Sequence, residues 1–240
     1  MSEANEEMDW LTSAAGQGFE NMGASCTSTA YLSMVQPGAS IESEATPAGT
    51  WVNTATGRSY GETVKVTVIA FRTIWAEREP TPPFRTVGRY LPNSIRVETR
   101  MPPKGQQGYP KMINPDTGYE VQELFVYAVI LPEYPEDGVL IFNPVVGNMK
   151  MCRSWNSQLK GQLLPNGAQA PIFGYQWYLQ VGLIPNPQQP KAEISRLIAV
   201  KRAELVNKEL FTGSINPVLQ ATKQQLIELT PGKLEEPTEE

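Results

Sequence analysis

The sequence predicts a mainly β chain with some helix: a small Greek-key barrel of the OB type, with a helix between its strands and helices appended at the C-terminal end. Three observations favour this class. Proline supplies 21 of the 240 residues, so long uninterrupted helices are few. Apolar and polar residues alternate in several runs, as in half-buried strands. One helical run falls between the third and fourth main strands, as in an OB fold. A generic β-rich α+β domain fits nearly as well.

The first strand is expected after an acidic N-terminal arm. Residues 1–48 are rich in small and acidic residues with little periodicity, and they predict that arm. The OB-like domain should then span residues 49–190. Residues 53–61 hold two glycines and predict a hairpin or bent loop. In residues 62–75, valines at every second position predict a long, half-buried strand.

The middle of the chain predicts two further strands and a return strand. Residues 86–90 and 94–100 predict one strand interrupted by a proline. A loop rich in proline and glycine follows and carries two lysines. Residues 121–131, β-branched and aromatic, predict the third strand. Residues 132–138 predict a turn, and residues 139–142 a short return strand.

The last hundred residues predict more helix. Residues 147–163 carry a mostly apolar stripe at spacings of three and four, which indicates a helix. Residues 171–184 predict a strand with aromatic residues at alternate positions. Helices are expected over residues 191–230: the first over 191–211, although its start also permits a strand, and the second from Asn216 to Leu229. Residues 231–240 form an acidic tail.

Composition argues against an enzyme. The chain has no histidine and only two cysteines, Cys26 and Cys152, so His-based triads, His-liganded metals and four-thiolate zinc sites are excluded. We find no phosphate-binding loop and no nucleophile elbow. We therefore expect no catalytic residues, no metal and no cofactor.

No apolar run approaches the ~18 residues of a membrane span, and no secretory signal is visible, so we expect no membrane partner.

Charge is distributed in blocks. The net charge is −5, yet residues 51–111 hold ten basic and four acidic residues, and residues 151–202 hold six basic and one acidic. Residues 1–50 hold seven acidic residues and no basic one. Basic blocks can attract polyanions even in an acidic chain, although such blocks are also common as solvated faces.

Aromatic residues near these bases suggest a surface for single strands. If valines of the first strand face the core, Phe71 and Trp75 project from the other face, and Phe125 and Tyr127 do the same on the third strand. Bases stack on such rings while Lys and Arg contact phosphates. The candidate nucleic-acid-binding residues are Lys65, Phe71, Arg72, Trp75, Arg78, Arg89, Arg96, Arg100, Lys104, Lys111, Phe125 and Tyr127. Arg85 is a further basic residue near them.

Two other interpretations of these rings stay open. They can be buried by the N-terminal arm or the last helices, or form a subunit interface, and a β-bulge would exchange the two faces of a strand. By contrast, Tyr175 and Trp177 share a face with aliphatic residues and are expected in the core. Tyr178 lies on the other face of that strand.

Several stretches resemble small proteins encoded in the replication modules of tailed bacteriophages, often described as single-stranded-DNA-binding proteins. The likeness lies in Gly49-Thr50-Trp51-Val52-Asn53-Thr54-Ala55-Thr56-Gly57, in residues 125–143, in Pro171-Ile172-Phe173, and in Ala14-Ala15-Gly16-Gln17-Gly18-Phe19-Glu20. It implies an OB-like fold, binding with little sequence preference, and an acidic tail that recruits partners. This tail ends in Thr238-Glu239-Glu240, without the aromatic or apolar tip of many such proteins.

We therefore expect a non-enzymatic single-stranded-DNA-binding protein of a phage-like replication or recombination system, in the cytoplasm of an infected bacterial host. Its expected partners are single-stranded DNA and replication proteins bound through the tail, and a homo-oligomer is allowed. The alternative is a phage virion or assembly protein whose sheet aromatics are buried between subunits.

Overall fold

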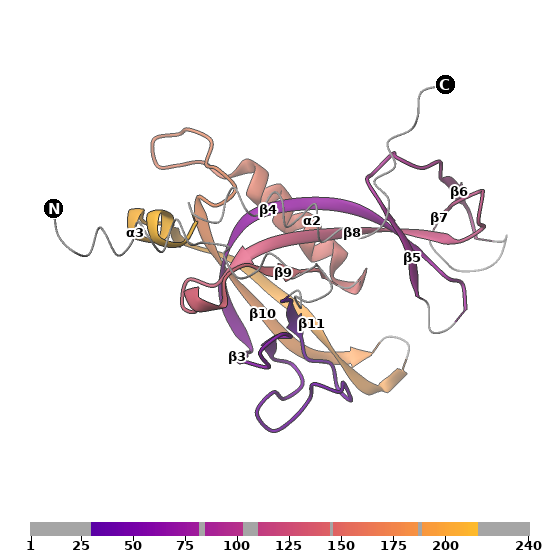
Figure 1. Ribbon diagram of the computed structural model, residues 1–240, viewed down its shortest axis with the longest axis horizontal. Coiled ribbons are helices and arrows are strands. Elements are labelled where there is room, and N and C mark those ends of the chain that lie inside the picture. Colours follow the sequence, from indigo (N-terminus) through magenta and orange to yellow (C-terminus); the bar gives the residue numbers. More distant parts are fainter. Residues whose placement is uncertain (1–29, 82–84, 103–109, 145, 187–188, 216–240) are drawn as a thin grey trace, which may run out of the picture.

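The structure is a computed structural model that describes residues 30–81, 85–102, 110–144, 146–186 and 189–215. Within these ranges the chain is mainly β, with two sheets and one helix of more than two turns. The predicted mainly β class with some helix is confirmed. Figure 1 shows two long strands, β4 (Thr63–Arg78) and β8 (Glu120–Ile130), that arch side by side from the body of the molecule to a smaller lobe.

The larger sheet has eight antiparallel strands in the order β11, β10, β4, β8, β7, β6, with β5 paired to β4 and β9 paired to β8. Its other strands are β5 (Thr86–Tyr90), β6 (Glu98–Arg100), β7 (Lys111–Ile113), β9 (Leu140–Phe142), β10 (Tyr175–Asn186) and β11 (Gln189–Leu205). At one end β4 and β8 lie between β10 and β9, and at the other end between β5 and β7. We call the end with β5, β6 and β7 the distal lobe, and the rest the body.

A small sheet and the helical elements complete the body. The small sheet contains β1 (Leu32–Met34), β2 (Trp51–Asn53) and β3 (Ser59–Gly61). The helical elements are the 3-10 turns η2 (Pro135–Asp137) and η3 (Val146–Asn148), helix α2 (Met149–Gly161), the short α3 (Lys208–Leu210) and the π-helical turn η4 (Phe211–Ile215). The indole nitrogen of Trp51 donates to the carbonyl of Leu179 at 3.1 Å, which ties the small sheet to β10.

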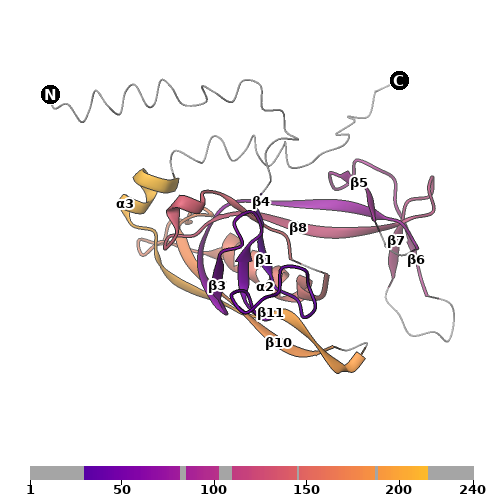
Figure 2. The same ribbon diagram turned by 60° about the horizontal axis from the view of Figure 1, so that its bottom comes forward.

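The main core lies between the large sheet, α2 and the small sheet. Helix α2 contributes its buried stripe of Met149, Cys152, Trp155 and Leu159, and β4, β8 and β10 contribute their facing side chains. Figure 2 shows α2 on one side of β4 and β8. We call the face of these two strands that packs against α2 the inner face, and the opposite one the outer face.

Several predicted elements are confirmed. The third strand, the return strand and the helix of residues 147–163 correspond to β8, β9 and α2. Trp177 is 1% exposed and Tyr175 is 9% exposed, so both belong to the core as predicted. A regular apolar stripe identifies α2, and β-branched and aromatic content identifies β8 and β9, which are buried on both faces.

Two predictions of secondary structure are wrong. The helix expected over residues 191–211 is instead the long strand β11, which pairs with β10 from Gln189 to Leu205. Pairing along a whole hairpin outweighs helix propensity, which is a weak prior. The strand expected over 86–100 is two strands, because β5 pairs with β4 while β6 pairs with β7. The predicted helix from Asn216 to Leu229, the acidic tail and residues 1–29 of the arm lie outside the described residues.

Candidate nucleic-acid interface

A β-bulge in β4 decides which side chains point toward α2. Val68 lies opposite Val129, but the next pairs are Ala70 with Ala128 and Phe71 with Tyr127, so Ile69 is an extra residue on β4. One inserted residue exchanges the two faces of a strand. Phe71 therefore shares the inner face with Val68, whereas strict alternation would place it on the outer face.

The four aromatic residues predicted as a stacking platform lie on this inner face, so the predicted solvent-facing orientation is wrong. Phe125 is 5% exposed, Tyr127 is 0% exposed and Trp75 is 9% exposed, while Phe71 is half-buried. The ring of Phe71 lies 5.1 Å from that of Tyr127, which stacks on Trp155 of α2 at 4.6 Å. These rings are packed within the chain itself.

The buried thiol beside this cluster has no nucleophilic character. Cys152 is 0% exposed, and burial raises the pKa of its thiol to about 12. Burial also raises the pKa of the Tyr127 hydroxyl, which donates to the side-chain oxygen of Asn156 at 2.8 Å. Because the thiolate is the reactive form of cysteine, Cys152 is a structural residue at neutral pH.

The outer face of β4 and β8 has an apolar centre in the distal lobe. Ile74 and Ala76 of β4 pack together with Leu124 and Val126 of β8, and we call these four residues the outer patch. Ile74 lies opposite Leu124 in the pairing register, as expected for side chains on one face. The first three are almost fully buried, although they are on the side away from α2.

Basic side chains surround the outer patch. Cross-strand partners share a face, so Arg72 opposite Val126 and Arg89 opposite Ala76 both belong to the outer face. Arg78 lies opposite Glu120, and the pairing of Glu120 with Ile113 extends the same face to β7 and β6. We call the resulting set the basic ring: Arg72, Arg78, Arg89, Arg100 and Lys111.

Acidic residues of the lobe strands are divided between the two faces. Glu98 and Glu120 share the outer face with the basic ring. Lys111 contacts Glu120 at 2.6 Å; partial burial opposes ionisation of this carboxyl, but hydrogen bonds from Lys111 and Gln122 outweigh it and lower its pKa. Glu77 and Glu123 instead lie on the inner face. The outer face of the lobe strands thus carries five cations against two carboxylates.

Glu77 anchors the distal lobe from inside. Its carboxylate is 1% exposed and accepts hydrogen bonds from the Tyr90 hydroxyl at 2.8 Å, from the Asn114 amide at 3.1 Å and from the Thr117 hydroxyl. These donors come from β5 and from the turn between β7 and β8. A buried charge is tolerated only with such partners. This role is not visible in the sequence, since a single Glu in a strand pattern is usually solvated.

The other predicted basic residues lie elsewhere. Lys65 is in the body, where its ammonium contacts Glu204 at 2.9 Å and Glu133 at 3.5 Å and lies over the ring of Tyr178. The hydrogen bond to Glu204 raises the pKa of Lys65. Arg85 is exposed beside the start of β5, and Arg96 pairs with Glu98 at 2.8 Å. Lys104 lies outside the described residues.

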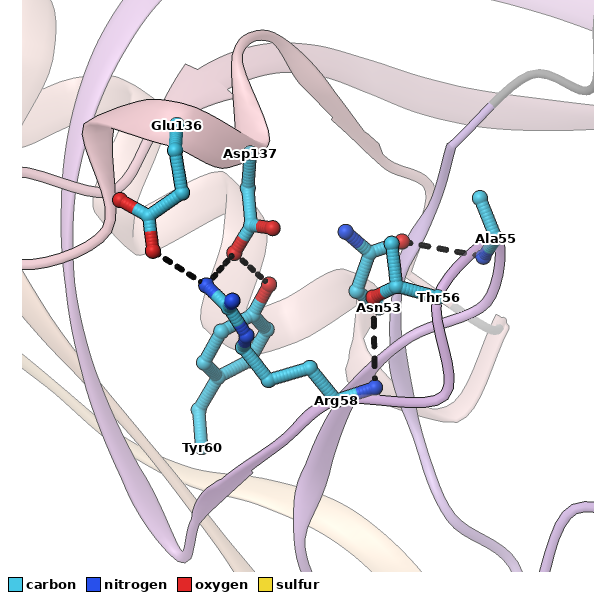
Figure 3. Close-up of polar contacts among 7 residues, drawn as sticks. All are labelled: Asn53, Ala55, Thr56, Arg58, Tyr60, Glu136 and Asp137. Atoms are coloured by element: carbon cyan, nitrogen blue, oxygen red, sulfur yellow. Dashed lines mark hydrogen bonds and ion pairs between the residues drawn. The ribbon is translucent and has the colours of Figure 1, made fainter.

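A second polar cluster fixes the small sheet to the body. Figure 3 shows Arg58 reaching two carboxylates of η2: its Nη1 atom lies 2.5 Å from Glu136 and 3.1 Å from Asp137. The Tyr60 hydroxyl donates to the same oxygen of Asp137 at 2.6 Å. Asn53, on the neighbouring strand, accepts from the amide of Ala55 and closes the turn. Because every charge has a partner, we assign this cluster a structural role.

Further observations bear on function. No group of three or more acidic or cysteine side chains within the described ranges is arranged to hold a metal ion. In the part of the chain that the structure covers, no helix has the length and apolar character needed to cross a membrane. No protein family, curated protein or solved structure was found to match the chain. The function must therefore be inferred from the geometry of the chain itself.

Proposed function

We propose that this protein binds single-stranded nucleic acid, and single-stranded DNA in the first place, through phosphate contacts on the outer face of the distal lobe. The observation that carries the proposal is the distribution of charge by strand register, which puts the basic ring on one face and Glu77 and Glu123 on the other. Arginine and lysine on one continuous sheet face can follow a phosphate backbone. The protein acts as a binder and not as an enzyme.

The mechanism differs from the one that sequence alone suggests. Stacking on Phe71, Trp75, Phe125 and Tyr127 is not part of it, because these rings pack in the core. Phosphate neutralisation by the basic ring supplies the affinity, and this term is independent of base sequence. The protein should therefore show little preference for particular base sequences.

The wider setting belongs to the same proposal. The resemblance to phage replication-module proteins supports a role in replication or recombination in the cytoplasm of an infected bacterium, with the acidic tail as a site for protein partners. An OB-like architecture is likewise proposed. It is supported by the antiparallel large sheet with α2 placed between β9 and β10.

Salt dependence tests the proposal directly. Four or five phosphate contacts predict a slope of roughly −3 in a plot of log binding constant against log salt concentration for oligo-dT. The measurement is a fluorescence-anisotropy titration of the full chain at several salt concentrations, beside a duplex of equal length. A slope near zero, or equal affinity for the duplex, would overturn single-strand binding.

An assembly role is the second candidate, and one observation favours it. The distal lobe projects from the body, and it exposes two large apolar side chains: Val87 at 49% and Met101 at 67%. Exposed apolar groups on a projecting element suit contact with another subunit. Light scattering on the purified chain separates the two functions, because assembly predicts a concentration-dependent oligomer that dissociates when Val87 and Met101 are replaced by Ser.

A further inference from the structure

Strand β11 is one edge of the large sheet, and side chains close part of that edge. The amide group of Gln36 takes the place of a neighbouring strand: its Nε2 atom donates to the carbonyl of Ser195 at 3.1 Å, and its Oε1 atom accepts from the backbone amide of Ser195 at 3.0 Å. The side-chain oxygen of Asn148 accepts from the backbone amide of Leu197 at 3.2 Å. The amides of Ser195 and Leu197, which point away from β10, therefore have acceptors.

A β-bulge shifts this pattern along the rest of β11. Leu197 lies opposite Val181, but Ala199 lies opposite Gln180, so Ile198 is an extra residue on β11. An extra residue changes which backbone groups of the bulged strand point toward its partner. The positions beyond Ile198 therefore have to be assigned from the hydrogen bonds of β10.

The backbone of β10 shows which groups of β11 point outward. The amide of Val181 donates toward β4, to the carbonyl of Glu62 at 2.9 Å, so the even-numbered residues of β10 face β11. Between the bulge and Arg202, their partners are the odd-numbered residues of β11. The N–H and C=O groups of Val200 and Arg202 therefore point away from the sheet, and no other described element forms a hydrogen bond with them.

This open part of the edge carries two cations, one on each face. Lys201 and Arg202 are consecutive, so their side chains leave opposite faces of the sheet. Both are exposed, and within the described ranges neither forms an ion pair with a carboxylate. Arg202 lies over the ring of Tyr175 at 4.8 Å. The one acidic residue among residues 199–205 is Glu204, which is already paired with Lys65 at 2.9 Å.

We propose that the open edge of β11, residues 199–205, binds an extended acidic segment of a partner protein as an added strand. The outward N–H and C=O groups supply main-chain hydrogen bonds to such a segment. Because Lys201 and Arg202 are adjacent and lie on opposite faces, the matching segment has two consecutive carboxylates in a β-forming stretch. A second copy of β11 does not match, since antiparallel registers centred on Lys201 or Arg202 place like charges opposite each other. The proposal does not depend on nucleic-acid binding by the distal lobe.

Binding of a synthetic peptide to the full chain tests the proposal. The peptide has two consecutive glutamates at its centre, with valine and threonine on both sides, and fluorescence anisotropy follows its binding. We expect Lys201→Gln combined with Arg202→Gln to weaken binding about ten-fold at low salt. The matched control, Lys150→Gln combined with Lys160→Gln, removes two exposed cations of α2 and should leave the affinity unchanged. Equal losses in the two variants, or no peptide binding to the unmodified protein, would overturn the proposal.

Methylation of the peptide backbone separates strand addition from a contact held by charge alone. One peptide is methylated at alternate amide nitrogens, and its isomer at the other set, because an added strand turns only one set of amides toward β11. We expect one isomer to lose binding and the other to keep it. Equal affinities of the two isomers would overturn strand addition, whether both bind or neither does.

Oligo-dT distinguishes this edge from the proposed nucleic-acid interface. The variant with Arg72→Gln, Arg78→Gln and Arg89→Gln should keep the full peptide affinity, and at 0.1 M salt oligo-dT should not displace the peptide from the unmodified protein. Displacement would make the edge of β11 part of a nucleic-acid surface and would overturn the peptide proposal. Peptide binding without any oligo-dT binding would overturn the proposed function and leave the strand addition intact.

Discussion

The two faces of β4 and β8 are built from the same backbone but from different chemistry. On the inner face, Phe71 packs against both Phe125 and Tyr127, and Tyr127 stacks on Trp155 of α2. On the outer face of the distal lobe, a small aliphatic patch is bordered by cations. Large rings fill space on the face that packs against α2, and cations gather on the opposite face.

Side-chain type alone does not identify which face of these strands is the candidate interface. Aromatic residues near arginines suggested a stacking surface, but the bulge at Ile69 turns Phe71 and Trp75 of β4 inward. On β8 the alternate positions that hold Phe125 and Tyr127, and not those of the aliphatic residues, face α2. The same bulge sets the positions of Arg72 and Arg78 on the outer face. In β4, one extra residue therefore assigns Phe71 and Trp75 to the inner face and Arg72 and Arg78 to the outer face.

The largest effect should come from the inner face. Trp155→Ala removes a fully buried ring stacked on Tyr127, and we expect a loss of ~3–5 kcal/mol in the free energy of unfolding. Urea denaturation measures it. Oligo-dT affinity of the folded fraction should stay unchanged, and an unchanged urea midpoint would contradict the core assignment.

Removal of the buried anchor should have the next largest effect. Glu77→Ala leaves the donors of Tyr90, Asn114 and Thr117 without their acceptor, which should cost about 2–3 kcal/mol. Glu123→Ala is the control, because Glu123 is partly exposed and its ion pair with Arg153 is worth less than ~1 kcal/mol. Equal urea midpoints for the two variants would contradict the anchoring role.

Alkaline pH should lower the free energy of unfolding by a smaller amount, through Cys152 on the inner side of the sheet. The fold holds the Cys152 thiol neutral and raises its pKa to about 12 from the model-compound value of 9.0, so the unfolded chain loses this proton first. Stability supplied by the neutral thiol is complete below pH 9 and declines above it. The decline between pH 9 and 10, followed by urea denaturation, should be shallower in Cys152→Ala. If the free energy of unfolding fell equally with pH in Cys152→Ala and in the unmodified protein, the contribution of the neutral thiol would be contradicted.

The smallest effect is expected at Lys65. Lys65→Gln removes contacts to two exposed carboxylates, Glu133 and Glu204, and should lower the free energy of unfolding by less than ~1 kcal/mol. The salt slope of oligo-dT binding should not change, because Lys65 lies in the body and not in the basic ring. If the salt slope of oligo-dT binding by Lys65→Gln were as shallow as that of a variant in the basic ring, Lys65 would also contact phosphate and the interface would include the body.

Regular periodicity made much of the fold predictable. Helix α2 buries one stripe at spacings of three and four, and the sequence shows that stripe directly. Strands β8 and β9 are recognisable from their β-branched and aromatic residues, but they are buried on both faces, so the sequence does not show which face packs against α2. Strand β11 was less clear, because Ile194, Ile198 and Val200 fit either a helix or a strand. Its conformation depends on pairing with β10 along a hairpin, which is a tertiary effect.

The candidate site was predictable only in part. The basic block of residues 51–111 indicated the region, and five of its members form the basic ring. Their common face depends on the register of five strands and on the bulge at Ile69, which leave no local signal in the sequence. Glu77 was missed for the same reason, since its three donors come from separate segments.

The difference between the faces can be tested by one matched pair of variants. The first neutralises three residues of the basic ring, as Arg72→Gln, Arg78→Gln and Arg89→Gln. The second neutralises three exposed cations of α2 on the inner side, as Lys150→Gln, Arg153→Gln and Lys160→Gln. Both variants change the net charge equally, so any difference between them reports position.

The measurement is the slope of log binding constant against log salt concentration for oligo-dT. At about 0.7 per phosphate contact, loss of three contacts should make the slope of the basic-ring variant shallower by about 2. The α2 variant should keep the slope of the unmodified protein. Equal slopes in the two variants, or the larger change in the α2 variant, would contradict the assignment of the outer face as the nucleic-acid interface.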